Sequence, residues 1–167
     1  VVASDTTGVG TVRASLAATT YGSSGQAIFG YGDSGAAASM TNLVTNVGVV
    51  GSDVSGVGTA RWDLAAATYG SDKAIFAYGK PSGYVSTSNL VSNTGVVSAD
   101  VTGVGTARGA LAAAGYGGDK AIFGYGGSGG YSSMTNLVNN SGVVASDVSG
   151  VGTNRQALAA AGYSTSA

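Results

Sequence analysis

The acidic and basic side chains that could do chemistry recur at fixed places along this chain of 167 residues. All eight acids are Asp, and the chain contains no His and no Cys. We predict that the recurring acids and bases form structural pins, because a carboxylate caps N–H groups in turns and Arg bridges to carboxylates and carbonyls. The alternative is a ring of charges that lines a channel or binds an ion. In each pair the Asp precedes the Arg by eight residues: Asp5 and Arg13, Asp53 and Arg61, Asp100 and Arg108, Asp147 and Arg155.

The missing residue types argue against catalysis. Without His or Cys the chain has no imidazole acid–base group, thiol nucleophile, disulfide or ordinary zinc ligand set. A hydrolase would need two Asp side chains in one cleft, whereas the Asp residues here recur with the repeat. We therefore predict that the protein is not an enzyme and uses no cofactor and no metal.

The charge balance also limits the partners. The formal net charge is −1, and 9% of the residues are charged. A nearly neutral chain is not typical of nucleic-acid or lipid-headgroup binding, and no apolar run reaches the ~18 residues of a membrane span. We expect no nucleic-acid partner and no membrane partner.

A repeat of 47 residues organises the whole chain. Positions 61–107 and 108–154 are identical at 30 of 47 places, so we predict one repeat array over 1–167. Its complete units are about 13–60, 61–107 and 108–154, with partial units at 1–12 and 155–167. The markers are Ala-Ile-Phe at Ala27, Ala74 and Ala121, and Gly-Val-Gly-Thr at Gly8, Gly56, Gly103 and Gly150.

Each unit is predicted to hold four short strands separated by turn residues. In one unit these are 108–116, 121–126, 134–138 and 143–146, with Gly, Asn, Asp and Ser between them. Four short strands per unit of this length are typical of a propeller blade. The sequence therefore predicts an all-β fold, a β-propeller built from four-stranded blades, with an open β-solenoid stack of the same units as the alternative.

Two stretches of the repeat, read most clearly in 61–107 and 108–154, resemble a kelch repeat. Arg-x-x-Leu-Ala-Ala-Ala-x-Tyr-Gly-x-Asp-Lys-Ala-Ile-Phe-x-Tyr-Gly is similar to the first two kelch strands, and Asn-Leu-Val-x-Asn-x-Gly-Val-Val to the third and fourth. Gly124-Tyr125-Gly126 stands in place of the family's diglycine, and the fourth-strand Trp is absent. The near-identical units also resemble repeat proteins of phage and marine metagenomic origin. That resemblance implies a virion-associated or extracellular role.

The differences between units indicate a candidate binding face. The loop after the second strand varies between units (33–38, 80–85 and 127–132), as does the residue that follows each Arg. In a four-stranded meander both sets emerge at the same end. Drift on an unconstrained surface is one explanation, and a binding face is the other. The exposed aromatic residues of that face, which would anchor a ligand, are Trp62, Tyr84 and Tyr131.

These patterns favour a non-catalytic structural or adhesion module over a carbohydrate-binding propeller lectin that uses the variable loops. An enzyme related to kelch-like oxidases or sugar mutarotases rests on fold analogy alone. Three units, an outer strand at Val1-Val2 and an inner strand at 155–163 cannot pair all their own edges. We therefore expect other copies of the chain, or a longer continuation of it, as partners, with glycans as ligands in the lectin alternative.

Overall fold

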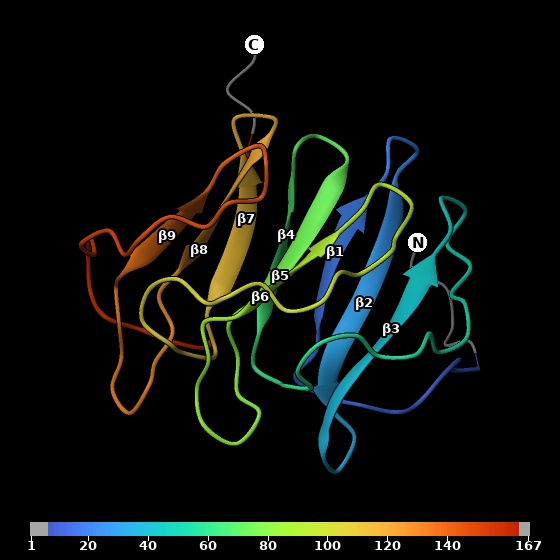
Figure 1. Ribbon diagram of the computed structural model, residues 1–167, viewed down its shortest axis with the longest axis horizontal. Helices are drawn as coiled ribbons and strands as arrows, with labels where there is room; N and C mark the ends of the chain where they lie inside the picture. The colour runs from blue at the N-terminus through green and yellow to red at the C-terminus, as the bar shows by residue number, and fades with distance from the viewer. Residues whose placement is uncertain (1–6, 164–167) are drawn as a thin grey trace.

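The computed structural model describes residues 7–163, which form nine β-strands and no helix (Figure 1). The strands make three antiparallel sheets of three strands each, and each sheet corresponds to one sequence unit. The prediction of an all-β fold is confirmed. Asp5 and the Val1-Val2 strand lie outside the described residues. The strands are β1 (Ala17–Tyr21), β2 (Gln26–Asp33) and β3 (Ala37–Val44) in unit 1, β4 (Ala65–Tyr69), β5 (Lys73–Ala77) and β6 (Ser88–Val91) in unit 2, and β7 (Ala112–Tyr116), β8 (Lys120–Gly124) and β9 (Thr135–Val138) in unit 3.

The first two strands of each unit form a hairpin. Ala113 pairs with Phe123 between β7 and β8, as Ala66 pairs with Phe76 between β4 and β5. The turn after β7 uses positive φ at Gly117 (59°), a backbone conformation that glycine adopts without a steric penalty. The prediction that the Ala-rich stretch and Ala-Ile-Phe lie on adjacent antiparallel strands is confirmed.

The strand boundaries differ from the predicted ones. β7 begins at Ala112 rather than at Arg108, because Ala110 has a positive φ of 51° that interrupts the extended backbone. β8 ends at Gly124, because Tyr125 and Gly126 both have positive φ.

The predicted fourth strand is not a regular strand in the described residues. In unit 3 it contributes only two isolated bridges to β9, Thr135 to Val148 and Val138 to Val144. The side chain of Asn136 explains the interruption, because its Nδ2 donates to the Ala145 carbonyl at 3.0 Å. That carbonyl would otherwise accept a backbone N–H of the ladder.

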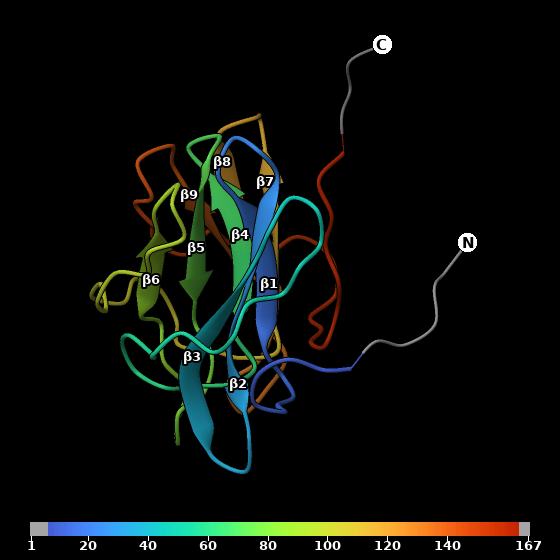
Figure 2. The same ribbon diagram turned by 90° about the vertical axis from the view of Figure 1, so that its right-hand side faces the viewer.

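The sheets pack face to face in chain order, and each boundary between units has its own apolar core. The first strands β1, β4 and β7 lie on one side and the third strands β3, β6 and β9 on the other (Figure 2). Tyr31 packs on Phe76 with ring centroids 5.2 Å apart, and Tyr78 packs on Phe123 at 5.5 Å. The Ala residues of β1, β4 and β7 are small enough to let the sheets approach closely.

The three sheets do not close into a ring within the described residues. Phe76 and Phe123 are fully buried, whereas Phe29, at the same place in unit 1, is 38% exposed because no other unit among residues 7–163 covers it. Among residues 7–163 no helix is long and apolar enough to cross a membrane.

Candidate functional site

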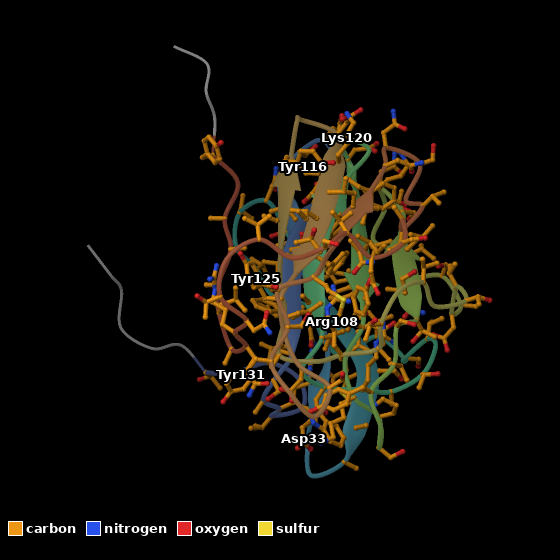
Figure 3. The ribbon with its side chains drawn as sticks, turned by 90° about the vertical axis from the view of Figure 1, so that its left-hand side faces the viewer. Asp33, Arg108, Tyr116, Lys120, Tyr125 and Tyr131 are labelled. Atoms are coloured by element: carbon orange, nitrogen blue, oxygen red, sulfur yellow. The ribbon has the colours of Figure 1, made fainter. Side chains whose placement is uncertain are left out.

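The repeated polar residues meet at the boundaries between units, where Arg108 shows the arrangement best. Its backbone belongs to the preceding sheet, because the Gly79 N–H donates to the Arg108 carbonyl at 2.9 Å. Its fully buried side chain enters unit 3, where Nε donates to the Tyr125 carbonyl at 2.8 Å and Nη2 donates to Asn136 Oδ1 at 2.6 Å. Arg108 therefore joins two units. In Figure 3 it lies between the end that carries Tyr116 and the end that carries Tyr131.

Asp147 completes this group from the loop beyond β9. Its carboxylate accepts the Thr106 backbone N–H at 2.9 Å, the Thr106 hydroxyl at 2.7 Å and the Asn136 Nδ2 at 2.9 Å. Arg108 Nη1 lies 3.9 Å from the same carboxylate. We call Tyr78, Thr106, Arg108, Asn136 and Asp147 together the inter-unit clamp.

The structure corrects the predicted Asp–Arg partners. Asp147 approaches Arg108, not Arg155, and Asp53 lies 3.7 Å from Arg13, not beside Arg61. Each of these Asp residues thus lies near the Arg at the start of its own unit. This is because the antiparallel sheet brings the end of the unit back to where the unit begins. The eight-residue spacing reflects only the order of the repeat.

Tyr78 ties the clamp to the preceding unit. The Arg108 guanidinium lies 4.3 Å from the centroid of the Tyr78 ring, a cation–π distance. The Tyr78 hydroxyl donates to the Val104 carbonyl at 3.2 Å, in the Gly-Val-Gly-Thr loop that leads to Arg108. Tyr78 holds a positive φ of 64°, which a non-glycine residue adopts only when its surroundings stabilise it. The Gly-Val-Gly-Thr loop is therefore a turn, stabilised by the Tyr78 hydroxyl and the Asp147 carboxylate.

The clamp shifts the ionisation of its members. Burial raises the pKa of Asp147, but the hydrogen bonds from Thr106 and Asn136 outweigh it, so that the pKa lies below the ordinary 3.8. Burial also raises the pKa of Tyr78, against the opposing effect of Arg108. The carboxylates are therefore charged and the Tyr hydroxyls protonated at neutral pH, as their roles as acceptor and donor require.

The same clamp occurs between units 1 and 2. Arg61 donates to the Tyr78 carbonyl at 2.8 Å and to Asn89 at 2.7 Å, and it lies 4.2 Å from the centroid of the Tyr31 ring. Asp100 accepts the hydroxyl of Thr59 at 2.6 Å and the amide of Asn89 at 2.9 Å. The sequence interpretation missed the Asn residues. Their signal was the Asn-Leu-Val string, which recurs with the same spacing at Asn42, Asn89 and Asn136.

The variable positions meet at one end of the sheets. The residue after each of the first three Arg residues forms a bridge to the start of the loop after the second strand: Ala14 to Asp33, Trp62 to Lys80, and Gly109 to Gly127. Tyr131 lies at this end with Asp33, whereas Tyr116 and Lys120 lie at the opposite end (Figure 3).

The predicted contact residues differ in exposure. Tyr131 is 64% exposed and Tyr84 is 38% exposed, but Trp62 is only partly exposed. Lys80 Nζ lies 5.3 Å from the centroid of the Tyr84 ring. We call this end, formed by 33–38, 80–85 and 127–132, the loop face. No group of three or more potential metal ligands occurs in residues 7–163.

No protein-family model matches the chain, and no curated protein matches it either. Among solved structures, that of YjhT is similar, with a TM-score of 0.59 and 12% sequence identity. The similarity covers 80% of this chain and 44% of the YjhT chain, so this chain spans less than half of that protein. At this identity the likeness concerns the fold alone.

Proposed function

We propose that the chain is a non-catalytic structural or adhesion module, an arc of a β-propeller with 47-residue blades. One observation carries this proposal. The polar residues that recur in every unit, which were the candidates for chemistry, contact residues across the unit boundaries: Thr106 donates to Asp147 of the next unit, and Arg108 lies on the Tyr78 ring of the preceding one. A repeating scaffold requires such nearest-neighbour contacts in each copy.

The propeller assignment is supported by the arrangement of the sheets. They pack face to face, their first strands lie on one side, and a fourth segment bridges to the third strand of each sheet. Display outside a cell or on a virion is the location that the resemblance to phage repeat proteins favours.

An Asp147→Asn variant tests the structural role. The lowered pKa means that the carboxylate stabilises the fold fully above the ordinary pKa of 3.8, and that this contribution is lost as the pH falls toward the lower folded-state value. We expect the variant to lose about 1–2 kcal/mol of unfolding free energy at pH 7, because hydrogen bonds to a charged group are replaced by weaker ones. Its stability should also fall less steeply below pH 4, measured by urea unfolding.

The charge-ring alternative predicts another result. If Asp147→Asn left the stability unchanged and calcium chloride raised the melting temperature of the unmodified protein but not of the variant, the carboxylates would be ligands and the structural proposal would be wrong. Asp33→Asn, on the loop face, controls for the loss of one acidic residue.

Carbohydrate binding is the second candidate, and the exposure of Tyr131 and Tyr84 on the loop face favours it. Exposed aromatic rings offer apolar area with little loss of conformational freedom. Equivalent loops in successive units would let weak contacts add through avidity.

A glycan array tests this candidate. We expect binding to a glycan to fall at least roughly ten-fold in Tyr84→Ala and Tyr131→Ala, the size of loss typical of an aromatic anchor. Trp62→Ala should weaken binding less, because Trp62 is partly covered. A Tyr116→Ala variant, changed at the opposite end, is the control. No bound glycan, or equal losses in all four variants, would eliminate the lectin function and leave the structural one.

A further inference from the structure

Two positions of the loop face meet across each unit boundary. One is the fifth residue of the loop after the second strand, and the other directly follows the Arg of the next unit. Between units 2 and 3 these positions hold Tyr84 and Gly109, and a Cβ on Gly109 would lie only 3.1 Å from Cε1 of the Tyr84 ring. The Tyr84 ring therefore lies against Gly109, which is buried. Large side chains at both positions would collide.

Between units 1 and 2 the sizes of the two residues are exchanged. The loop position is Ala37, and Trp62 follows the Arg. The backbones of Trp62 and Gly109 are equivalent, because each residue forms a bridge to the start of the loop in its own unit and is followed by a residue with positive φ. The Cβ of Trp62 is therefore directed at the place that the Tyr84 ring fills one boundary later. Ala37 leaves that place open to the indole.

At the end of unit 3 the loop supplies the aromatic residue again. Tyr131 stands at the loop position, and Gln156 follows the Arg. Gln156 is larger than Gly109, and Tyr131 is 64% exposed, whereas Tyr84 is 38% exposed. Each boundary among residues 7–163 thus has one aromatic side chain from this pair of positions, although neither position holds the same residue in all units.

Neither drift nor a need to cover the clamp accounts for these rings. Independent changes at the two positions would have no reason to leave one ring at every boundary. A ring that only covered the clamp would be buried, as Tyr78 is, but Tyr84 and Tyr131 keep much of their area in solvent. Exposed aromatic side chains that are retained in this way are suited to anchoring a ligand.

The charges around the rings indicate the class of ligand. The three loops contain one acid, Asp33, and one base, Lys80. Asp63, whose Cβ lies 3.3 Å from the Cβ position of Gly109, adds a second acid. A face with so few bases is not suited to polyanions such as nucleic acids and acidic polysaccharides. The apolar faces and hydroxyl-rich edges of uncharged sugars instead match aromatic rings that are surrounded by Ser residues and loop backbone.

We propose that these aromatic rings form equivalent binding subsites, one at each unit boundary, for a linear uncharged carbohydrate. Each subsite is built from two units, and its ring can come from either of them. A ligand with repeated sugars would contact successive rings, so that weak contacts add through avidity. This inference rests on the carbohydrate-binding candidate above, and it specifies the ligand and the positions that bind it.

A size exchange at the first boundary tests whether the two positions share one place. Ala37→Tyr should lower the melting temperature by about 2–10 °C, because the new ring collides with Trp62. In a double-mutant cycle this loss should disappear when Trp62→Gly is already present, because the pair then copies Tyr84 and Gly109. No loss in Ala37→Tyr, or the same loss in both backgrounds, would overturn the proposal.

Isothermal titration calorimetry with malto-, cello-, chito- and manno-oligosaccharides tests the ligand. The longer oligosaccharides should bind more tightly than the shorter ones, and polygalacturonate, an acidic polymer, should bind most weakly. We expect Trp62→Gly to weaken binding roughly three-fold, and the addition of Ala37→Tyr to restore at least the original affinity. Tyr116→Ala, at the opposite end of the sheets, is the control and should bind like the unmodified chain.

The outcomes separate this inference from the proposals on which it rests. If an oligosaccharide bound but the added Ala37→Tyr restored nothing, or if polygalacturonate bound more tightly, the carbohydrate candidate would stand and the shared subsites for an uncharged ligand would be wrong. If no oligosaccharide bound, both would be wrong. The scaffold proposal is tested separately by Asp147→Asn.

Discussion

Replacing Arg108 by Ala is expected to lower the free energy of unfolding by about 3–5 kcal/mol, the range for breaking a buried charged network. The side chain is fully buried and donates to Thr106, Tyr125 and Asn136. Its loss leaves these acceptors without donors in a space that water enters poorly, and it leaves a cavity beside the Tyr78 ring. Urea unfolding followed by circular dichroism measures the change.

The matched control is Arg155→Ala, at the same repeat position. Arg155 is exposed, and the only hydrogen bond of its side chain within the described residues is a long one of 3.4 Å to the Thr153 carbonyl. We expect a loss below about 1 kcal/mol, as for most surface substitutions. Similar losses in the two variants would show that the buried network contributes little, and that the Arg residues stabilise the fold only through stacking on Tyr.

The period and the hairpins could be predicted because they depend on local signals. Ala-Ile-Phe supplies an apolar strand, and Gly117 and Gly118 supply the positive φ of the turn before it. The meeting of the variable loops could also be predicted, because in an antiparallel meander alternate connections emerge at the same end. The bridge between Trp62 and Lys80 shows that juxtaposition.

The residues that pair in the clamp could not be predicted, because they depend on how the antiparallel sheet brings the end of each unit back to its beginning. Asp147 and Arg108 are far apart in sequence, and Arg155, which is nearer to Asp147, was predicted as its partner. The structural role of Tyr125, which stands where a kelch repeat has its diglycine, could not be predicted either. Its positive φ of 65° becomes tolerable only when its ring supports Arg155 and its hydroxyl bonds to Val151. The prediction of a regular fourth strand was wrong because the Asn136 side chain donates to the Ala145 carbonyl, which would otherwise accept a backbone N–H from the neighbouring strand.

Replacing Gly105 by Ala is expected to destabilise the fold by about 2–5 kcal/mol, the sum of backbone strain and overpacking. Gly105 has a φ of +77°, and a Cβ there would lie 2.6 Å from Asn136 Nδ2 and would also strike the Asp147 carboxylate. Those two groups are fixed by their bonds to each other and to Thr106 and Arg108, so they cannot move without breaking the clamp. Thermal and urea unfolding measure the loss.

Gly152→Ala separates the two causes. Gly152 has the same place in the repeat and nearly the same φ, +79°, but nothing lies within 4 Å of its Cβ position. It therefore bears only the strain of a left-handed backbone, about 1–2 kcal/mol, partly offset in both variants by the lower entropy of the unfolded chain. The difference between the variants measures the contact with the clamp. Equal losses would mean that the Asp147 and Asn136 side chains move aside for a methyl group, and that the clamp is less rigid than its hydrogen bonds imply.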